Sequence, residues 1–230
     1  MTTAENHLIE LLAPRDRARL LRLCEPVELV LADVLCEPGE PTRHAYFPVD
    51  GFISLLALTD GKAGLEVGMA GREGMLGAQL ALGVPTTPLR AQVQGPGAAW
   101  RIGTQPLRDE LARNSALQAI LNRYIHVLLS QLAASAACLR FHMIGPRLAR
   151  WLLMSQDRAH CDRFRVTHEF VASMLGVRRV GITTAAVAMQ RSGLIKYHHG
   201  DLTVLDRSGL EAAACSCYAA DQRAYVRLLP

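Results

Sequence analysis

Glycine and proline are concentrated in one stretch of the chain, between Pro38 and Pro106. This stretch holds 12 of the 18 glycines and 7 of the 11 prolines, a density that prevents long helices. Short runs of strand-forming residues lie between these breakers, at 45–49, 52–58, 64–67, 91–93 and 98–102. Their regular spacing predicts a small antiparallel barrel or sandwich in this part of the chain.

Helical patterns lie on both sides of this stretch. Leucines among charged residues at 6–24 predict an amphipathic helical hairpin, broken near Pro14. Beyond Pro106 apolar residues recur at steps of four, three, four and seven residues, as in a coiled-coil seam. They are Leu121, Ile125, Leu128, Leu132 and Leu139. A continuous helix over 115–140 would be about 39 Å long.

A helix of this length with so wide an apolar stripe has more than one face to bury. One face is expected to pack on the strands and the other on a second copy of the chain. The predicted dimer contacts are Leu121, Ile125, Leu128 and Leu132. The alternative is a core helix within a single subunit.

The net charge differs between the two parts of the chain. Residues 1–142 hold 13 Arg and Lys against 14 Asp and Glu, a net charge of −1, whereas residues 143–230 hold 12 against 7, a net charge of +5. All basic residues except Lys62 and Lys196 are arginines, whose planar donors suit phosphates and guanine edges. This distribution predicts a polyanionic partner for the C-terminal part.

A helix, a glycine turn and a second helix are predicted within 167–195. Thr167 is suited to cap a first helix at 168–175, Gly176 supplies a sharp turn, and a second helix begins near Arg178 and ends at Gly193. These are the proportions of a helix-turn-helix. Two short alternating runs, 194–197 and 202–205, follow and predict a two-stranded hairpin, the wing of a winged helix.

The exposed face of this unit carries the candidate DNA contacts. No acidic residue occurs between Gly176 and Gly200. Arginine pairs bidentately with the O6 and N7 atoms of guanine, and threonine bonds to bases or phosphates. The predicted DNA-contacting residues are Thr167, His168, Arg178, Arg179, Val180, Thr183, Thr184 and Lys196. The alternative is an ordinary solvated face.

Several motifs of the chain resemble one known family. In the C-terminal part they are RLARWLL at 147–153, EFVASMLGVRR at 169–179, LIKYHHG at 194–200 and LDRSGLEAAAC at 205–215. In the N-terminal part they are EPGEP at 37–41, YFPVDGFISLL at 46–56 and GREGMLG at 71–77. With these motifs the whole chain resembles the Crp/Fnr transcription regulators, the cyclic-AMP receptor protein superfamily.

The resemblance implies an α+β fold in three parts. They are an N-terminal antiparallel β-roll with flanking helices at 1–114, jelly-roll-like and of the cyclic-nucleotide-binding type, a dimerisation helix at 115–142, and a C-terminal winged helix-turn-helix domain at 143–230. It also implies double-stranded DNA, a second copy of the chain and RNA polymerase as partners. Arg179 takes the place of the family's base-reading arginine, and Val180 stands where the best-known members have an acidic residue.

The family's cyclic-nucleotide cassette is incomplete in this chain. Gly77 is followed by Ala78 instead of the expected glutamate, and Leu89 stands where an arginine is expected. Arg90 is one residue out of register, which on a strand points it to the opposite face. Cyclic AMP is therefore not an expected ligand. Gln79 and Arg90 are the candidate contacts for an unidentified small-molecule effector.

The six cysteines are dispersed, which indicates reduced thiols rather than a disulfide scaffold. Cys24 and Cys36 are too far apart for the N-terminal iron–sulfur cluster of some family members. Cys138 and His142 lie one helical turn apart, but two ligands are insufficient for a metal site. Cys215 and Cys217 form only an isolated CxC pair. The sequence therefore predicts no metal site.

The expected function is a sequence-specific, homodimeric DNA-binding regulator controlled through the β-roll, with no catalytic residues and no enzymatic activity. A ligand-sensing module with secondary DNA binding is the alternative. The first ten residues show no signal-peptide pattern, and the longest charge-free helical stretch, 124–139, has 16 residues. A cytoplasmic protein without a membrane partner is therefore expected.

Overall fold

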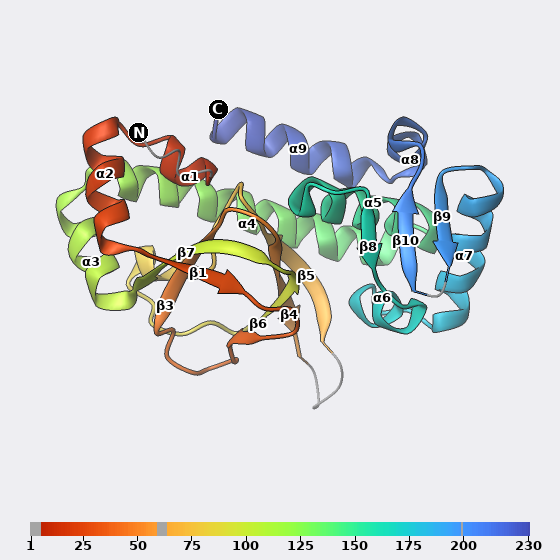
Figure 1. The fold of residues 1–230 in the computed structure, drawn as a ribbon, viewed down its shortest axis with the longest axis horizontal. Helices are drawn as coiled ribbons and strands as arrows, with labels where there is room; N and C mark the ends of the chain where they lie inside the picture. The colour runs from red at the N-terminus through yellow and green to blue at the C-terminus, as the bar shows by residue number, and fades with distance from the viewer. Residues whose placement is uncertain (1–5, 59–63, 199) are drawn as a thin grey trace.

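The N-terminal part is built on two antiparallel sheets, of strand order β1-β7-β3 and β2-β6-β4-β5, on the left of Figure 1. The computed structural model describes residues 6–58, 64–198 and 200–230. The strands are β1 (Glu25–Leu29), β2 (Val34–Cys36), β3 (His44–Pro48), β4 (Phe52–Ala57), β5 (Leu65–Ala70), β6 (Arg90–Gly95) and β7 (Gly97–Gly103). This is the antiparallel architecture predicted from the glycine and proline spacing.

Strands β3 to β7 lie where the sequence predicts strands, whereas no pattern predicts β1 and β2. β1 contains Pro26 and shows no regular alternation of buried and exposed residues, and β2 has only three residues. Both lie at the edges of their sheets. An edge strand has a single neighbour, so its conformation depends on pairing more than on its own sequence pattern.

Short helices flank the sheets. α1 (His7–Glu10) and α2 (Pro14–Leu23) form the expected hairpin, with Pro14 in the first turn of α2, where the backbone N–H has no helical partner. A 3-10 helix, η1 (Ala78–Leu82), and α3 (Thr104–Arg113) follow later in the chain. Side chains from these helices, β3, β7 and the long helix that follows form one buried cluster.

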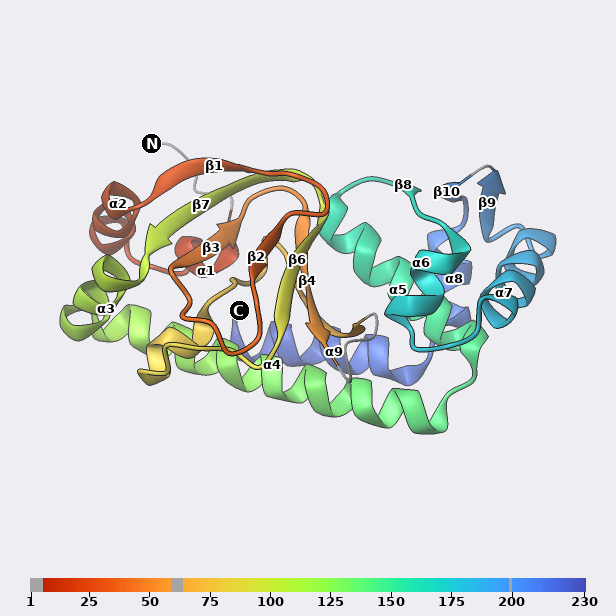
Figure 2. The same ribbon diagram turned by 90° about the horizontal axis from the view of Figure 1, so that it is seen from below.

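The long helix α4 (Ser115–Phe141) joins the two parts of the chain and runs along the lower side of the molecule in Figure 2. Asn114 caps it by accepting a hydrogen bond from the Leu117 amide at 3.0 Å. Tyr124 is fully buried, and its hydroxyl donates to the Met75 carbonyl at 3.1 Å. The N-terminal half of α4 is therefore fixed to the β-roll.

Part of the predicted seam of α4 is used inside the subunit. Leu121 has no exposed surface, so it is a core residue rather than part of an accessible seam. Ile125 and Leu128 are half-buried against the same cluster, and Leu132 is half-buried. Leu129, on the neighbouring stripe, is 59% exposed.

By length and composition alone α4 also meets the requirements of a membrane-spanning helix, as core helices of soluble proteins do.

The C-terminal part surrounds helix α5, on the right of Figure 1. Its elements are α5 (Ile144–Ala159), β8 (Arg163–Arg165), α6 (His168–Met174), α7 (Arg179–Arg191), β9 (Ile195–His198), β10 (Asp201–Val204), α8 (Arg207–Ala213) and α9 (Ser216–Leu228). Strands β8, β10 and β9 form an antiparallel sheet in that order, so the predicted wing has a third strand. Residue 199, in the turn of the predicted hairpin, lies outside the described residues.

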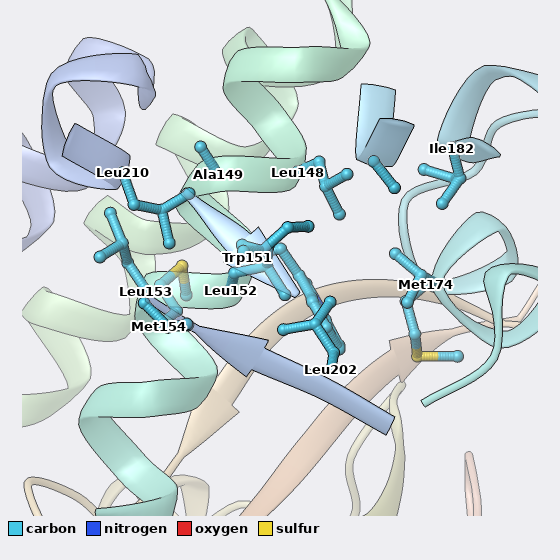
Figure 3. Packing of buried hydrophobic residues seen from close by; sticks show 14 of the residues in the cluster. Leu148, Ala149, Trp151, Leu152, Leu153, Met154, Met174, Ile182, Leu202 and Leu210 are labelled. Atoms are coloured by element: carbon cyan, nitrogen blue, oxygen red, sulfur yellow. The ribbon is translucent and has the colours of Figure 1, made fainter. Parts of the chain in front are cut away.

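Helix α5 organises the core of this part. It begins at Ile144 and holds Gly145 and Pro146 in its first turn. A proline is tolerated there because the first N–H groups of a helix have no partner within it. Figure 3 shows how Leu148, Trp151 and Leu152 of α5 pack against other elements of this part. Their neighbours in the cluster include Met174 of α6, Ile182 of α7 and Leu202 of β10.

The two parts share a core across the expected boundary at residue 143. The β-roll contributes Phe52, Leu56 and Met69 to the cluster built on α5. The Trp151 indole donates a hydrogen bond to the Glu66 carboxylate at 2.9 Å. Arg158 on α5 pairs with Glu73 at 2.8 Å. The β-roll and α5 are therefore joined by apolar, hydrogen-bonded and ionic contacts.

Helix α9, which no sequence pattern predicts, returns along α4 towards the N-terminal helices (Figures 1 and 2). The Gln131 amide on α4 donates to the Tyr225 hydroxyl at 3.1 Å. At the end of the chain, the His7 ring donates to the Leu229 carbonyl at 2.8 Å. The C-terminal segment therefore packs on the N-terminal part as well as on α4.

Candidate nucleic-acid interface

Helices α6 and α7 form the predicted helix-turn-helix. The Thr167 hydroxyl accepts a hydrogen bond from the Phe170 amide at 3.1 Å and caps α6. Gly176 adopts a φ of +60° in the turn, a left-handed conformation that favours glycine. The two helices are inclined at 111°, within the range of this motif. The Thr167 cap and the Gly176 turn therefore determine the angle between α6 and α7.

One face of α7 packs on the protein and the opposite face is solvent-exposed. Ile182, Ala186 and Met189 are buried in the core around α5. The exposed side carries Arg178, Arg179, Val180, Thr184, Val187, Ala188 and Arg191. Within α7 itself and its N-cap there is no acidic side chain. The first turn of α7 therefore presents two arginines and an apolar side chain at the outer surface.

Arg179 has an acidic neighbour, Glu169, which lies outside the acid-free segment 176–200. Its Nε lies 4.0 Å from Glu169 Oε2, and the two side chains are 69% and 79% exposed. A pair this exposed contributes little stability, so Arg179 is free to exchange Glu169 for another acceptor. Arg178 is exposed as the N-cap residue of α7.

His168 and Thr183, two predicted DNA contacts, are hydrogen-bonded to each other. The Thr183 hydroxyl donates to the Arg179 carbonyl at 3.1 Å and therefore accepts from Nδ1 of His168, 3.0 Å away. The His168 ring also stacks on Tyr197 of β9, with centroids 4.4 Å apart. Burial, together with the charge of Arg179, lowers the pKa of His168. The neutral imidazole thus joins α6, α7 and β9, and its polar atoms are not directed to solvent.

The small sheet beside α7 adds further basic side chains. Lys196 is exposed on β9, as predicted for the wing. Arg165, on the unpredicted strand β8, is exposed as well. Arg163 on the same strand pairs with Asp201 at 2.9 Å. The sequence pattern misses the two arginines because a three-residue strand has no period to recognise.

The two predicted effector contacts do not converge. Gln79 lines a cavity of about 280 Å³ between the β-roll and α4, where its amide donates to the Thr42 hydroxyl at 2.9 Å. Arg90 is not among the lining residues and pairs with Glu37 at 3.0 Å. This agrees with its expected orientation towards the opposite face of the strand. Leu89, at the position expected to hold an arginine, lines the cavity.

A family model described as the Crp-like helix-turn-helix domain matches residues 146–213. No curated protein sequence matches the chain. FixK2 from Bradyrhizobium japonicum is similar in structure, with 13% identity, a TM-score of 0.70 and an alignment covering 84% of this chain and 98% of that one.

Two further solved regulators have the same fold. CLP from Xanthomonas campestris, described as a c-di-GMP responsive global regulator, has 16% identity and a TM-score of 0.68, with 84% of this chain and 100% of that chain covered. A CRP/FNR-family transcriptional regulator from Thermus thermophilus has 20% identity and a TM-score of 0.64, with 83% and 98% covered. Residues 146–213 therefore match a Crp-like helix-turn-helix domain, and the chain as a whole shares the fold of solved Crp/Fnr-type regulators.

Proposed function

We propose that the chain acts as a homodimer that recognises a pseudo-palindromic operator through α7. The observation that carries this proposal is the exposed first turn of α7, where Arg178, Arg179 and Val180 project from a helix held at 111° to α6. An α-helix presented in this way fits the major groove of B-form DNA. With two-fold symmetry the half-sites would lie roughly 34 Å apart, about one helical turn.

The proposed contacts divide into base readers and phosphate or positioning residues. We assign Arg179 to a guanine edge, Val180 to a thymine methyl group, and Arg178 and Thr184 to the adjacent bases or phosphates. Lys196 and Thr167 are proposed phosphate contacts. His168 and Thr183 act as positioning residues, because their hydrogen bonds to each other and to the Arg179 carbonyl orient α7.

The Arg179→Ala variant tests this assignment. It should weaken binding to the selected operator by about 1 to 3 kcal/mol and relax the preference at one base position. Fluorescence anisotropy against the operator and a shuffled duplex measures both effects at fixed salt. Arg113→Ala, which removes an exposed arginine from α3, serves as the control and should leave both affinities unchanged. An equal loss on both duplexes would instead assign Arg179 to a phosphate.

The exposed apolar side of α4 supports the dimer. Leu129 and Leu139 are 59% and 36% exposed, and the predicted contacts Ile125, Leu128 and Leu132 lie half-buried on the same side of the helix. Exposed apolar side chains gathered along one helix are typical of a subunit interface. With Leu121 in the core, the proposed seam comprises Ile125, Leu128, Leu132 and this outer stripe.

Leu129→Asp should weaken the dimer by about 100-fold, or about 2.7 kcal/mol, because it introduces a carboxylate into an apolar contact. Sedimentation equilibrium over a range of protein concentrations gives the dissociation constant. Val30→Asp is the matched control, since Val30 is also an exposed apolar residue but lies in the loop after β1. An unchanged dimer in Leu129→Asp would exclude this stripe from the interface.

We propose the same division of the chain as the sequence predicts: sensor at 1–114, dimer helix at 115–142 and DNA-binding domain at 143–230. Cytoplasmic location follows from a DNA target, and RNA polymerase remains a predicted partner on family resemblance alone. The contacts of Glu66 and Glu73 with α5 offer a route by which a change in the β-roll shifts the DNA-binding helices.

Effector sensing by the β-roll is the second candidate function. The supporting observation is the cavity beside α4, which is lined largely by apolar side chains and by Gln79. No arginine or lysine is found among the described residues that line it, and a cyclic phosphate would need a buried cation. Calorimetry with cyclic AMP, cyclic GMP and cyclic di-GMP should therefore show no micromolar binding. Micromolar affinity for any of them would identify the effector class.

A further inference from the structure

Four metal-ligating side chains that are distant in the sequence meet where the end of α4 contacts the start of α9. Cys138 and His142 lie at the C-terminal end of α4. Cys215 is the N-cap of α9, and Cys217 lies in its first turn. One sulfur or nitrogen atom from each residue lies within 4.8 Å of the others. The sequence predicts no metal because the α4 pair supplies only two ligands, and the fold adds the other two.

The spacing of this Cys3His cluster matches a tetrahedral metal site. The sulfur atoms of Cys138 and Cys215 are 3.5 Å apart, and the Cys217 sulfur is 3.6 Å from Nδ1 of His142. Zinc binds sulfur at about 2.3 Å and imidazole nitrogen at about 2.0 Å, which separates ligand atoms at tetrahedral corners by roughly 3.5 to 3.8 Å. Little movement would be needed to enclose an ion.

The chemistry of the cluster also selects among metals. Three thiols and an imidazole are the ligand set of structural zinc sites, whereas magnesium, calcium and manganese prefer oxygen ligands. In an iron–sulfur cluster the four protein ligands are divided among several iron atoms, so they do not all surround one position as these four atoms do. All three cysteines are buried and contact one another apart from the main hydrophobic cores. With four protein ligands the site would be closed, which is the mark of a structural rather than a catalytic metal.

The surroundings supply compensating charge. Three thiolates and a neutral imidazole around a divalent ion carry a net charge of −1. Arg147 and Arg150 of α5 line a small cavity of about 40 Å³ together with Cys138. Arg150 also bonds to Asp221 of α9 at 2.7 Å, and the Cys215 amide donates to the Pro146 carbonyl at 3.3 Å. The α9 side of the cluster is thus anchored to α5 as well as to α4.

We propose that the Cys3His cluster binds one structural zinc ion that joins the end of α4 to the start of α9. The two α9 ligands lie beyond residue 213, where the match to the Crp-like domain ends. The ion would fix α9 along α4 and thereby fix the position of the DNA-binding part relative to the long helix. This inference does not depend on DNA binding, so its failure would leave the proposed function intact.

The full-length chain, purified under reducing conditions, provides the test. Elemental analysis should find one zinc per chain, and titration of the metal-free protein with cobalt should give the thiolate charge-transfer and d–d absorption of a tetrahedral ion. Cys217→Ser and His142→Gln should each lose the zinc and the tetrahedral spectrum, whereas Cys161→Ser, which alters an exposed thiol outside the cluster, should retain both. Chelation should lower the Tm of the wild type but not that of Cys217→Ser.

Two results would overturn the proposal. One is a reduced wild-type chain that contains no stoichiometric metal and shows no thiolate–cobalt absorption. The other is a disulfide between Cys138 and Cys215 that persists in the native protein and prevents cobalt binding, as detected by mass spectrometry after alkylation. The wild-type cobalt spectrum does not depend on any variant. The proposal can therefore be tested even if a variant folds poorly.

Discussion

Asp221→Asn should lower the free energy of unfolding by about 3 to 5 kcal/mol, the cost of leaving a buried charge without its partner. Asp221 of α9 lies 2.7 Å from Arg150 of α5, and each side chain is only 9% exposed. Burial raises the pKa of Asp221, and the charge of Arg150 opposes that rise. In the variant the Arg150 guanidinium stays buried without the Asp221 carboxylate, so urea denaturation should show a lower midpoint.

Asp201→Asn is the matched control for this measurement. Its partner Arg163 lies 2.9 Å away, but the side chains of Arg163 and Asp201 are 70% and 44% exposed, so the expected loss is below about 1 kcal/mol. The double variant Arg150→Met/Asp221→Leu should recover most of the stability, because it removes both buried charges. Equal effects of Asp221→Asn and Asp201→Asn would show that α9 does not enclose the pair.

The second large effect is a change in how stability depends on pH in Glu66→Gln. The Glu66 carboxylate accepts hydrogen bonds from Ser54 at 2.5 Å and from the Trp151 indole at 2.9 Å. Its desolvation outweighs these bonds and raises the pKa of Glu66 to about 7. The difference between this pKa and the ordinary value of 4.5 corresponds to about 3 kcal/mol of stability. Because the residue is partly exposed, we expect an effect on stability of about 2 kcal/mol.

The sign follows from proton linkage. Because its pKa is higher in the folded state, the folded chain holds the Glu66 proton more tightly than the unfolded chain. This contribution to stability is complete below pH 4.5 and is lost as the pH rises towards 7. Glutamine keeps an acceptor for Trp151 and has no such proton, so the stability of Glu66→Gln relative to wild type should rise by about 2 kcal/mol between about pH 4.5 and about pH 8.

Urea denaturation of both proteins at several pH values measures this difference. Glu40→Gln, in an exposed position before β3, controls for the general effect of removing a carboxylate. A difference between Glu66→Gln and wild type that stays constant across this pH range would refute the buried, protonated state. Glu66 joins the β-roll to α5 through Trp151. We therefore expect any pH-dependent change in the contact between the β-roll and α5 to occur in this pH range.

Local sequence signals were sufficient to predict the two helices of the interface, α6 and α7. Thr167 caps α6 and Gly176 takes the left-handed turn conformation, as their residue types predict. The α7 helix begins within one residue of the prediction. Caps, glycine turns and helical periodicity act over a few residues, so they can be recognised without knowledge of the rest of the fold.

Features that depend on distant contacts could not be predicted in this way. Strands β1, β2 and β8 owe their conformation to pairing with strands far along the chain. The bond between His168 and Thr183 arises only after α6 and α7 pack. Leu121 fits the coiled-coil spacing, but packing of α4 on the β-roll buries it. The Cys3His cluster likewise needs α9 to return to α4 from a distant part of the sequence.

Selection of binding sites from random double-stranded DNA by the full-length chain tests the central claim most directly. We predict enrichment of a pseudo-palindromic sequence with half-sites about one helical turn apart, bound by two chains, with an affinity that falls as salt concentration rises. Repeating the selection with Arg179→Ala should relax one position in each half-site. The absence of any salt-dependent DNA binding by the wild-type chain would contradict the claim.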